Sequence, residues 1–206
     1  MENYIITISR DFASMGRTIA SKMAQMLGIK YYDRDIVEKV SREIGLPVPQ
    51  VFEEEEKASS YFSRSFPLGN STTELQDQIF TAQRRVITEL AEKESCIIVG
   101  RCAEYTLAGH KRMLNIHIYT SYENKYNNCV NYLHLDPKDA KKLIKTVDRA
   151  REAYHMRYAG YFPNDPDHND LLIDSAVLGV EGTASLLVEM IKLKFELSDD
   201  TRQEIS

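Results

Sequence analysis

Four short apolar runs, separated by segments with helical patterns, limit the folds that this chain of 206 residues can adopt. The runs are Tyr4–Ser9, Cys96–Gly100, Leu114–Tyr119 and Leu171–Asp174. Continuous hydrophobic runs of this length, alternating with helices, are typical of strands buried in a parallel sheet. We therefore predict an α/β fold of three layers, in which helices cover both faces of a parallel sheet.

The segments between these runs carry the 3.6-residue periodicity of amphipathic helices. Helices are expected over 19–27, 35–44, 74–93 and 181–195, and a further helix is expected to begin at Asp136-Pro137. Gly28 suits the position after the first helix, and Asp136 suits an N-cap with Pro137 at the first helical position. Ser71-Thr72-Thr73-Glu74 fits a capping box at the start of the third helix. A short strand is expected at Tyr31-Tyr32.

Composition indicates one ordinary globular domain, because 43% of the residues are hydrophobic and 28% are charged. A net charge of -5 gives no general attraction to nucleic acid or to an anionic membrane, so neither is expected as a partner. No apolar run approaches the roughly 20 residues of a membrane span, and no basic segment precedes the first strand. We therefore expect a cytoplasmic protein. The three cysteines lack CxxC spacing, which favours buried reduced thiols over disulfides or zinc ligands.

The segment Ser9–Thr18 joins the first strand to the first helix, an arrangement that cradles phosphate on backbone N–H groups. The strict motif G-x-x-x-x-G-K-[ST] is not met. In an ungapped alignment Arg10 and Met15 take the glycine positions and Gly16 takes the position of the lysine. Thr18 falls where kinases with a G-K-G-T loop place a threonine that binds magnesium. By itself this segment does not distinguish a phosphate-binding loop from a polar turn without a ligand.

Further residues give this loop a family resemblance. Ser9-Arg10, Ser14 and Gly16-Arg17, followed by Tyr32-Asp33-Arg34, resemble the start of the cytidylate-kinase-like family, which has an atypical loop without the lysine. Ala13 and Met15 depart from the glycines usual in that family. The resemblance implies a P-loop-type fold with a core over 1–45, 96–123 and 169–195. It also implies a helical acceptor-binding insertion over 46–95, a lid over 124–168 and a polar tail over 196–206.

The same resemblance implies a site for the phosphoryl donor, ATP with Mg²⁺. Its expected ligands are Ser14, Gly16, Arg17 and Thr18, with Thr18 also contacting the metal. Arg17 is expected to supply the charge of the missing lysine, because a guanidinium group binds phosphate through a planar, permanently charged fork. Arg10 is a second candidate for that role, and its alternative is an ion pair with Asp11.

The acceptor site is expected at Asp33, Arg34 and Arg101. Arg101 follows a predicted buried strand at its carboxyl end, where ligands bind in open α/β sheets, and the family carries a Gly-Arg here that contacts the acceptor. Asp33 and Arg34 match the family's acceptor-binding groups. The alternative for these two is an N-cap for the helix at Asp35 and a surface arginine.

Arginines over 148–158 resemble those of the family's lid. Arg151 and Arg157 are expected to neutralise charge on the transferring phosphoryl group, so that Arg17, Arg151 and Arg157 form the catalytic set. On a helix, Asp148 can pair with Arg151 three residues later. The five histidines show no ligand spacing, and no Ser/His/Asp triad can be argued from the sequence.

The expected function is transfer of the γ-phosphoryl group of ATP, or another nucleoside triphosphate, to a nucleoside monophosphate. Family naming suggests CMP or dCMP as the acceptor, so small nucleotides are the expected partners. Two alternatives stay open. The missing lysine favours a catalytically inactive nucleotide-binding or regulatory module, and a kinase of another small metabolite would keep the chemistry but change the acceptor.

Overall fold

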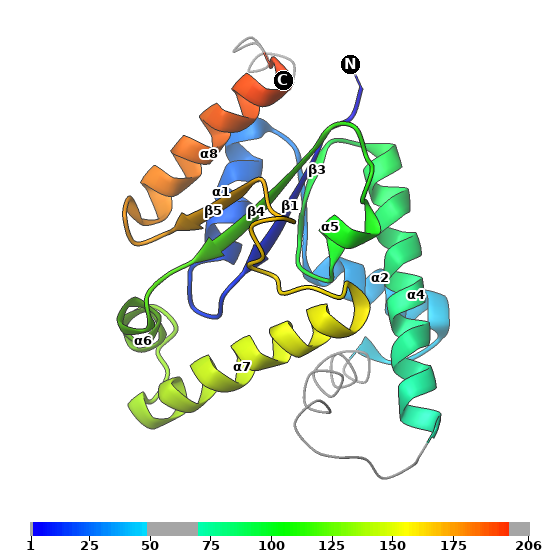
Figure 1. Cartoon of the computed structure of the whole chain (residues 1–206), viewed down its shortest axis with the longest axis horizontal. Helices are drawn as coiled ribbons and strands as arrows, with labels where there is room; N and C mark the ends of the chain where they lie inside the picture. The colour runs from blue at the N-terminus through cyan, green and yellow to red at the C-terminus, as the bar shows by residue number, and fades with distance from the viewer. Residues whose placement is uncertain (1, 49–69, 198–206) are drawn as a thin grey trace.

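The computed structural model describes residues 2–48 and 70–197. Within these ranges five strands form one sheet: β1 (Ile5–Arg10), β2 (Lys30–Tyr32), β3 (Cys96–Val99), β4 (Met113–Tyr119) and β5 (Leu171–Asp174). Their order across the sheet is β2-β3-β1-β4-β5, and every neighbouring pair is parallel. Figure 1 shows the strands side by side in the middle of the molecule. The predicted parallel α/β fold is confirmed.

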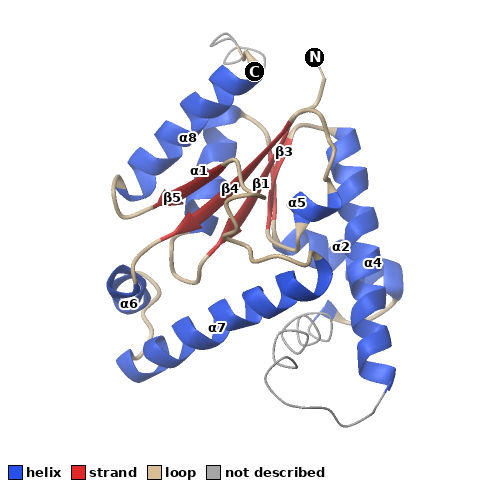
Figure 2. Ribbon diagram, in the orientation of Figure 1, coloured by secondary structure: helices blue, strands red, loops and turns tan. Residues whose placement is uncertain are grey.

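Helices cover both faces of the sheet, as Figure 2 shows. On one face lie α1 (Gly16–Leu27) and α8 (Gly179–Phe195), and on the other lie α2 (Arg34–Ile44), α4 (Asn70–Lys93) and the short α5 (Ala103–Thr106). Successive residues of a strand point to opposite faces, so Ile6 and Ile8 join the core with α1 and α8, whereas Ile5 joins the core with α2 and α4. Burial on both faces explains why the strands are continuously apolar.

Two further helices, α6 (Tyr122–Asn131) and α7 (Pro137–Tyr158), lie beyond the carboxyl ends of the strands. They pack together through Cys129, Ala140 and Ile144, and this small cluster includes Phe12 and Ala13 from the loop after β1. The predicted cap of α7 is confirmed, since the Asp136 side chain accepts a hydrogen bond of 2.8 Å from the Lys138 backbone N–H. The predicted lid segment therefore rests against the predicted phosphate loop.

Some predicted boundaries are wrong. Helix α4 already includes Asn70, so Ser71 and Glu74 lie inside it and the predicted capping box does not mark its start. Strand β3 ends at Val99 because Gly100 has a φ of 74°, a left-handed conformation that leaves the strand. Residues 49–69 of the predicted acceptor-binding insertion lie outside the described residues, as do residues 198–206 of the predicted polar tail. No helix in the described ranges is long and apolar enough to cross a membrane.

Candidate functional site

A cavity of about 230 Å³ opens at the carboxyl ends of β1 and β3, under the helix α7. Arginine is the commonest residue in its wall, and Asp33 and Glu104 supply its two carboxylates. The lining residues are Ser9, Arg10, Arg17, Asp33, Gly100, Arg101, Cys102, Glu104, Val147, Ala150, Arg151, Tyr154, His155 and Pro163. Four of the sequence-predicted site residues, Arg17, Asp33, Arg101 and Arg151, thus meet in one place.

The loop between β1 and α1 forms a tight turn without most of the usual glycines. Ala13 and Met15 have φ values of 57° and 60°, so both adopt the left-handed conformation in which glycine is normally favoured. The hydroxyl of the buried Ser14 donates a hydrogen bond of 3.0 Å to the Asp11 carbonyl oxygen, which stabilises the turn. Gly16 is required where α1 begins, because a Cβ there would lie 2.8 Å from the Arg10 Cβ.

Asp33 joins two of the predicted arginines. Its buried carboxylate lies 2.5 Å from Arg17 Nε and 3.2 Å from Arg101 Nη1. Burial alone raises the pKa of Asp33, but Arg10, Arg101 and Arg17 outweigh it, and the pKa lies below its ordinary value. Although Asp33 stands directly before α2, its side chain makes no capping hydrogen bond. Asp33 therefore acts as the counter-ion of the arginines and not as an N-cap.

Arg10 also belongs to the cavity. The suggested ion pair between Arg10 and Asp11 does not form, since Asp11 contacts Lys125 Nζ at 2.7 Å and His117 Nε2 at 3.3 Å. The Arg10 guanidinium lies instead against Gly100, where a Cβ would overlap its Nη1. Burial and the charge of Arg151 lower the pKa of Arg10 well below its ordinary value. Four guanidinium groups converge here, so the cavity is suited to an anionic ligand.

Helix α7 is attached to the loop by Arg151 and Asp148. Arg151 Nη1 donates a hydrogen bond of 2.9 Å to the Arg10 carbonyl oxygen. The predicted pairing of Asp148 with Arg151 is replaced by contacts of the Asp148 carboxylate with the Phe12 N–H at 2.5 Å and with Lys125 Nζ at 2.8 Å. α7 is therefore held over the cavity by polar contacts to the loop that follows β1.

The comparisons with known proteins support the resemblance. The cytidylate kinase-like family matches residues 5–177. The chain belongs to this family. No relative among the curated proteins matches it.

Two solved structures show the fold of this cytidylate kinase-like protein. An uncharacterised protein from Eubacterium ventriosum is 24% identical and superposes with a TM-score of 0.69. The match covers 95% of this chain and 100% of the Eubacterium ventriosum chain. The shikimate kinase from Bacteroides thetaiotaomicron is 12% identical and gives a TM-score of 0.57. The match covers 92% of this chain and 98% of the shikimate kinase chain. The fold is thus that of P-loop kinases such as shikimate kinase.

Five predicted site residues of the cytidylate kinase-like protein lie outside the arginine cavity, and two of them, Ser14 and Gly16, shape the turn between β1 and α1. Arg157 contacts Asp77 at 2.8 Å and Gln76 at 2.9 Å, and so joins α7 to α4. Arg34 is exposed on α2. Thr18 is exposed on α1 and lines a separate hollow beside Arg17.

The residues around the loop allow a test of the predicted Mg²⁺ site. The nearby carboxylates of Asp11, Asp33 and Asp148 are each paired with lysine, arginine or histidine. The Thr18 hydroxyl is a neutral oxygen near the start of α1. Because Mg²⁺ keeps several waters and often binds mainly through substrate phosphates, this set fits an ion that arrives bound to a triphosphate.

Two groups of side chains were missed by the sequence analysis. Ser9 Oγ lies 2.7 Å from His117 Nδ1, and His117 Nε2 lies 3.3 Å from Asp11 Oδ1, so Ser9, His117 and Asp11 stand next to one another. Ser9 and His117 meet because β1 and β4 pair in a register that places these two residues side by side. Ser9 Oγ also donates to the Pro163 carbonyl oxygen at 3.0 Å, so it anchors the segment after α7 to β1.

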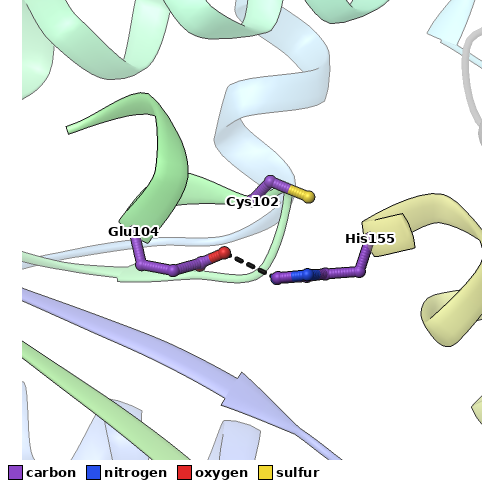
Figure 3. A group of neighbouring side chains, drawn as sticks. All are labelled: Cys102, Glu104 and His155. Carbon is purple, nitrogen blue, oxygen red and sulfur yellow. Dashed lines mark hydrogen bonds and ion pairs between the residues drawn. The ribbon is translucent and has the colours of Figure 1, made fainter. Parts of the chain in front are cut away.

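The second missed group is Cys102, Glu104 and His155, drawn in Figure 3. His155 Nε2 lies 2.6 Å from Glu104 Oε1, and all three residues are buried. Burial lowers the pKa of His155, but the hydrogen bond and charge of Glu104 outweigh burial and raise it overall. His155 is 51 positions from Glu104, and no regular spacing marks the two as neighbours.

Proposed function

We propose that this cytidylate kinase-like protein transfers the γ-phosphoryl group of ATP, or another nucleoside triphosphate, to a nucleoside monophosphate. The family name suggests CMP or dCMP as the acceptor, and a cytoplasmic location would supply both nucleotides. The observation that supports the proposal is the convergence of Arg10, Arg17, Arg101 and Arg151 on one cavity. Guanidinium groups bind phosphate oxygens through paired, charge-assisted hydrogen bonds, so this wall suits the phosphate groups of such reactants.

The donor is proposed to bind at the start of α1. Arg17 and the backbone N–H groups of the loop would hold its phosphates, with Ser14 and Gly16 shaping the turn. Thr18 would help to hold Mg²⁺ that arrives with the triphosphate. When bound, this ion would neutralise charge on the transferring phosphoryl oxygens.

The acceptor is proposed to bind on the side of β3. Arg101, oriented by Asp33, would hold its phosphate opposite the donor, and Arg151 would contact the group in transfer. Phosphoryl transfer depends mainly on positioning and electrostatic stabilisation, which this arrangement of arginines can supply. Helix α7 covers the cavity and would exclude water, which limits hydrolysis of the donor. Arg157 would serve indirectly, by holding α7 against α4.

Two observations favour the alternative functions. Lys125, a lysine next to the loop, is held between the carboxylates of Asp11 and Asp148, so it does not replace the missing lysine as a free cation. This favours an inactive nucleotide-binding module. The cavity of about 230 Å³ is smaller than the 300–1,000 Å³ of typical ligand pockets, which favours a small acceptor. A kinase of another small metabolite is therefore the second alternative.

A turnover assay with a matched pair of variants separates these functions. The protein is incubated with ATP and Mg²⁺ and a panel of nucleoside monophosphates and small hydroxylated metabolites, and ADP release is followed. The proposal expects turnover on a monophosphate, lost in Arg101→Gln and retained in Arg42→Gln, which changes an exposed arginine of α2. Turnover only on a metabolite would favour the second alternative. Tight ATP binding without turnover on any acceptor would favour the inactive module.

A further inference from the structure

The group Cys102, Glu104 and His155 has the composition of a transition-metal site. Cys102 and Glu104 belong to the turn after β3 and the start of α5, and His155 comes from α7 across the cavity (Figure 3). One ligand atom from each lies within 4.8 Å of the other two. Sulfur, nitrogen and carboxylate oxygen together are the donors that Zn²⁺ accepts in proteins.

The surroundings of His155 orient it as metal-binding histidines are oriented. Its Nδ1 lies 2.9 Å from the carbonyl oxygen of Tyr161, so Nδ1 carries the hydrogen and donates it to that oxygen. The Tyr161 ring packs edge-on against the imidazole, with centroids 4.9 Å apart. A backbone carbonyl that binds one ring nitrogen and directs the other toward the ligands is the usual outer partner of a metal-bound histidine.

We propose that Cys102 Sγ, Glu104 Oε1 and His155 Nε2 bind one Zn²⁺ ion, with a fourth position open to the arginine cavity. All three residues line that cavity, so water or an oxygen of a bound ligand can complete a tetrahedral site. A thiolate and a carboxylate cancel the two charges of the ion. The occupied site is therefore neutral overall, which makes it compatible with an anion bound beside Arg10, Arg101 and Arg151.

Binding requires a small rearrangement and the release of protons. Ligands held at about 2.0–2.1 Å in a tetrahedron lie roughly 3.3 Å apart. His155 Nε2 and Glu104 Oε1, now 2.6 Å apart, must separate slightly to admit the ion. The Zn–S bond replaces the S–H bond of Cys102, and the Zn–N bond replaces any proton on Nε2. These protons pass to solvent, so the metal binds more tightly as the pH rises.

The test uses Zn²⁺ and Co²⁺ with the full chain, stripped with chelator and kept reduced. The expected result is one ion per chain, and for Co²⁺ a thiolate-to-metal charge-transfer band together with the visible bands of tetrahedral Co²⁺. Loss of an outer partner alone weakens metal sites about 10–100-fold, so Cys102→Ser and His155→Gln should weaken Zn²⁺ binding about 100-fold or more. Cys129→Ser, which removes another fully buried thiol, is the control and should bind normally.

Two results would overturn the proposal: no stoichiometric ion in the folded wild-type protein, or Co²⁺ binding without a thiolate band. Equal Zn²⁺ affinity of the wild type and of a folded Cys102→Ser variant would do the same. If Cys102→Ser does not fold, the thiolate band and proton release of the wild type still decide the question. Every readout is of metal binding, so the result does not depend on whether the protein transfers phosphate.

Discussion

Arg151 Nη1 donates a hydrogen bond of 2.9 Å to the backbone carbonyl oxygen of Arg10, which lies 141 positions earlier in the chain. One turn before Arg151, the Asp148 carboxylate accepts a hydrogen bond from the Phe12 N–H. The phosphate loop and α7 are therefore joined by two polar contacts. A movement of α7 away from the cavity must break both, so loop conformation and closure of the cavity are coupled.

Arg151→Lys tests this coupling. Lysine keeps the positive charge but lacks the planar fork that can contact Arg10 and a ligand at once. We expect at least about tenfold weaker binding of inorganic pyrophosphate, measured by calorimetry, since one lost charge-assisted hydrogen bond is worth about 1.5–3 kcal/mol. Arg149→Lys is the control, because Arg149 is exposed on the same helix. Equal affinities of the two variants would remove Arg151 from the site.

Gly100→Ala is expected to disrupt the cavity from the side of β3. Gly100 has a φ of 74°, and a Cβ there would overlap Arg10 Nη1. Gly109→Ala is a matched control, because Gly109 has a φ of 93° but nothing lies within 4 Å of its added Cβ. Both variants should lose about 1–2 kcal/mol of unfolding free energy from the left-handed backbone. Only Gly100→Ala should also lose pyrophosphate affinity, and a similar loss in Gly109→Ala would contradict the assignment of Arg10.

Ala13→Gly should relieve strain in the loop. At a φ of 57°, alanine costs about 1–2 kcal/mol that glycine does not. Glycine costs about 0.5–1 kcal/mol through the entropy of the unfolded chain, so the net change should be neutral or stabilising by up to about 1.5 kcal/mol. Ala20→Gly, inside α1, has the same effect on the unfolded chain and no strain to relieve. Denaturant unfolding should therefore separate the two variants, with Ala20→Gly clearly less stable.

The sheet could be predicted because its strands are buried on both faces and therefore read as continuous apolar runs. Helix α6 was not predicted, since Tyr122–Asn131 is largely polar and shows little periodicity. Three cavity arginines could also be predicted, because short local motifs mark them. Arg17, Arg101 and Arg151 each occur in a short family motif, and Arg101 also follows the end of a buried strand.

The rest of the site depends on contacts between distant segments. Nothing near Arg10 in the sequence shows that Asp11 pairs with Lys125 of α6 and leaves Arg10 to the cavity. In the same way, Glu104 and His155 meet only because α7 returns across the end of the sheet. Arg157 carries the lid pattern, but its place on α7 directs it to Asp77 of α4. Helix docking decides these positions, and local sequence does not encode it.

Asp33→Asn tests whether the cavity holds more positive charge than its own residues neutralise. Removing one partner of a buried ion pair costs about 3–5 kcal/mol, so the variant should be clearly less stable than the wild type at neutral pH. Asp77→Asn is the control, because the Asp77 carboxylate is exposed and its pair with Arg157 is worth at most about 1 kcal/mol. Both are measured by denaturant unfolding, with circular dichroism to confirm the native fold.

The same variant should depend more strongly on anions and less on acid than the wild type. An anion that occupies the cavity at 100 times its dissociation constant stabilises the folded state by about 2.7 kcal/mol. With Asp33 neutralised, pyrophosphate should bind more tightly, and the unfolding midpoint should rise further with pyrophosphate than in the wild type.

The pKa of Asp33 is lowered by the arginines, so the contribution of Asp33 to folding stability is present above the ordinary carboxyl pKa of about 3.9. This contribution is lost as pH falls through the lower folded-state pKa. The stability gap between wild type and Asp33→Asn should therefore narrow only in that acid range. A gap that stays constant there, or pyrophosphate binding that weakens in Asp33→Asn, would show that Asp33 is not the counter-ion of an anion site.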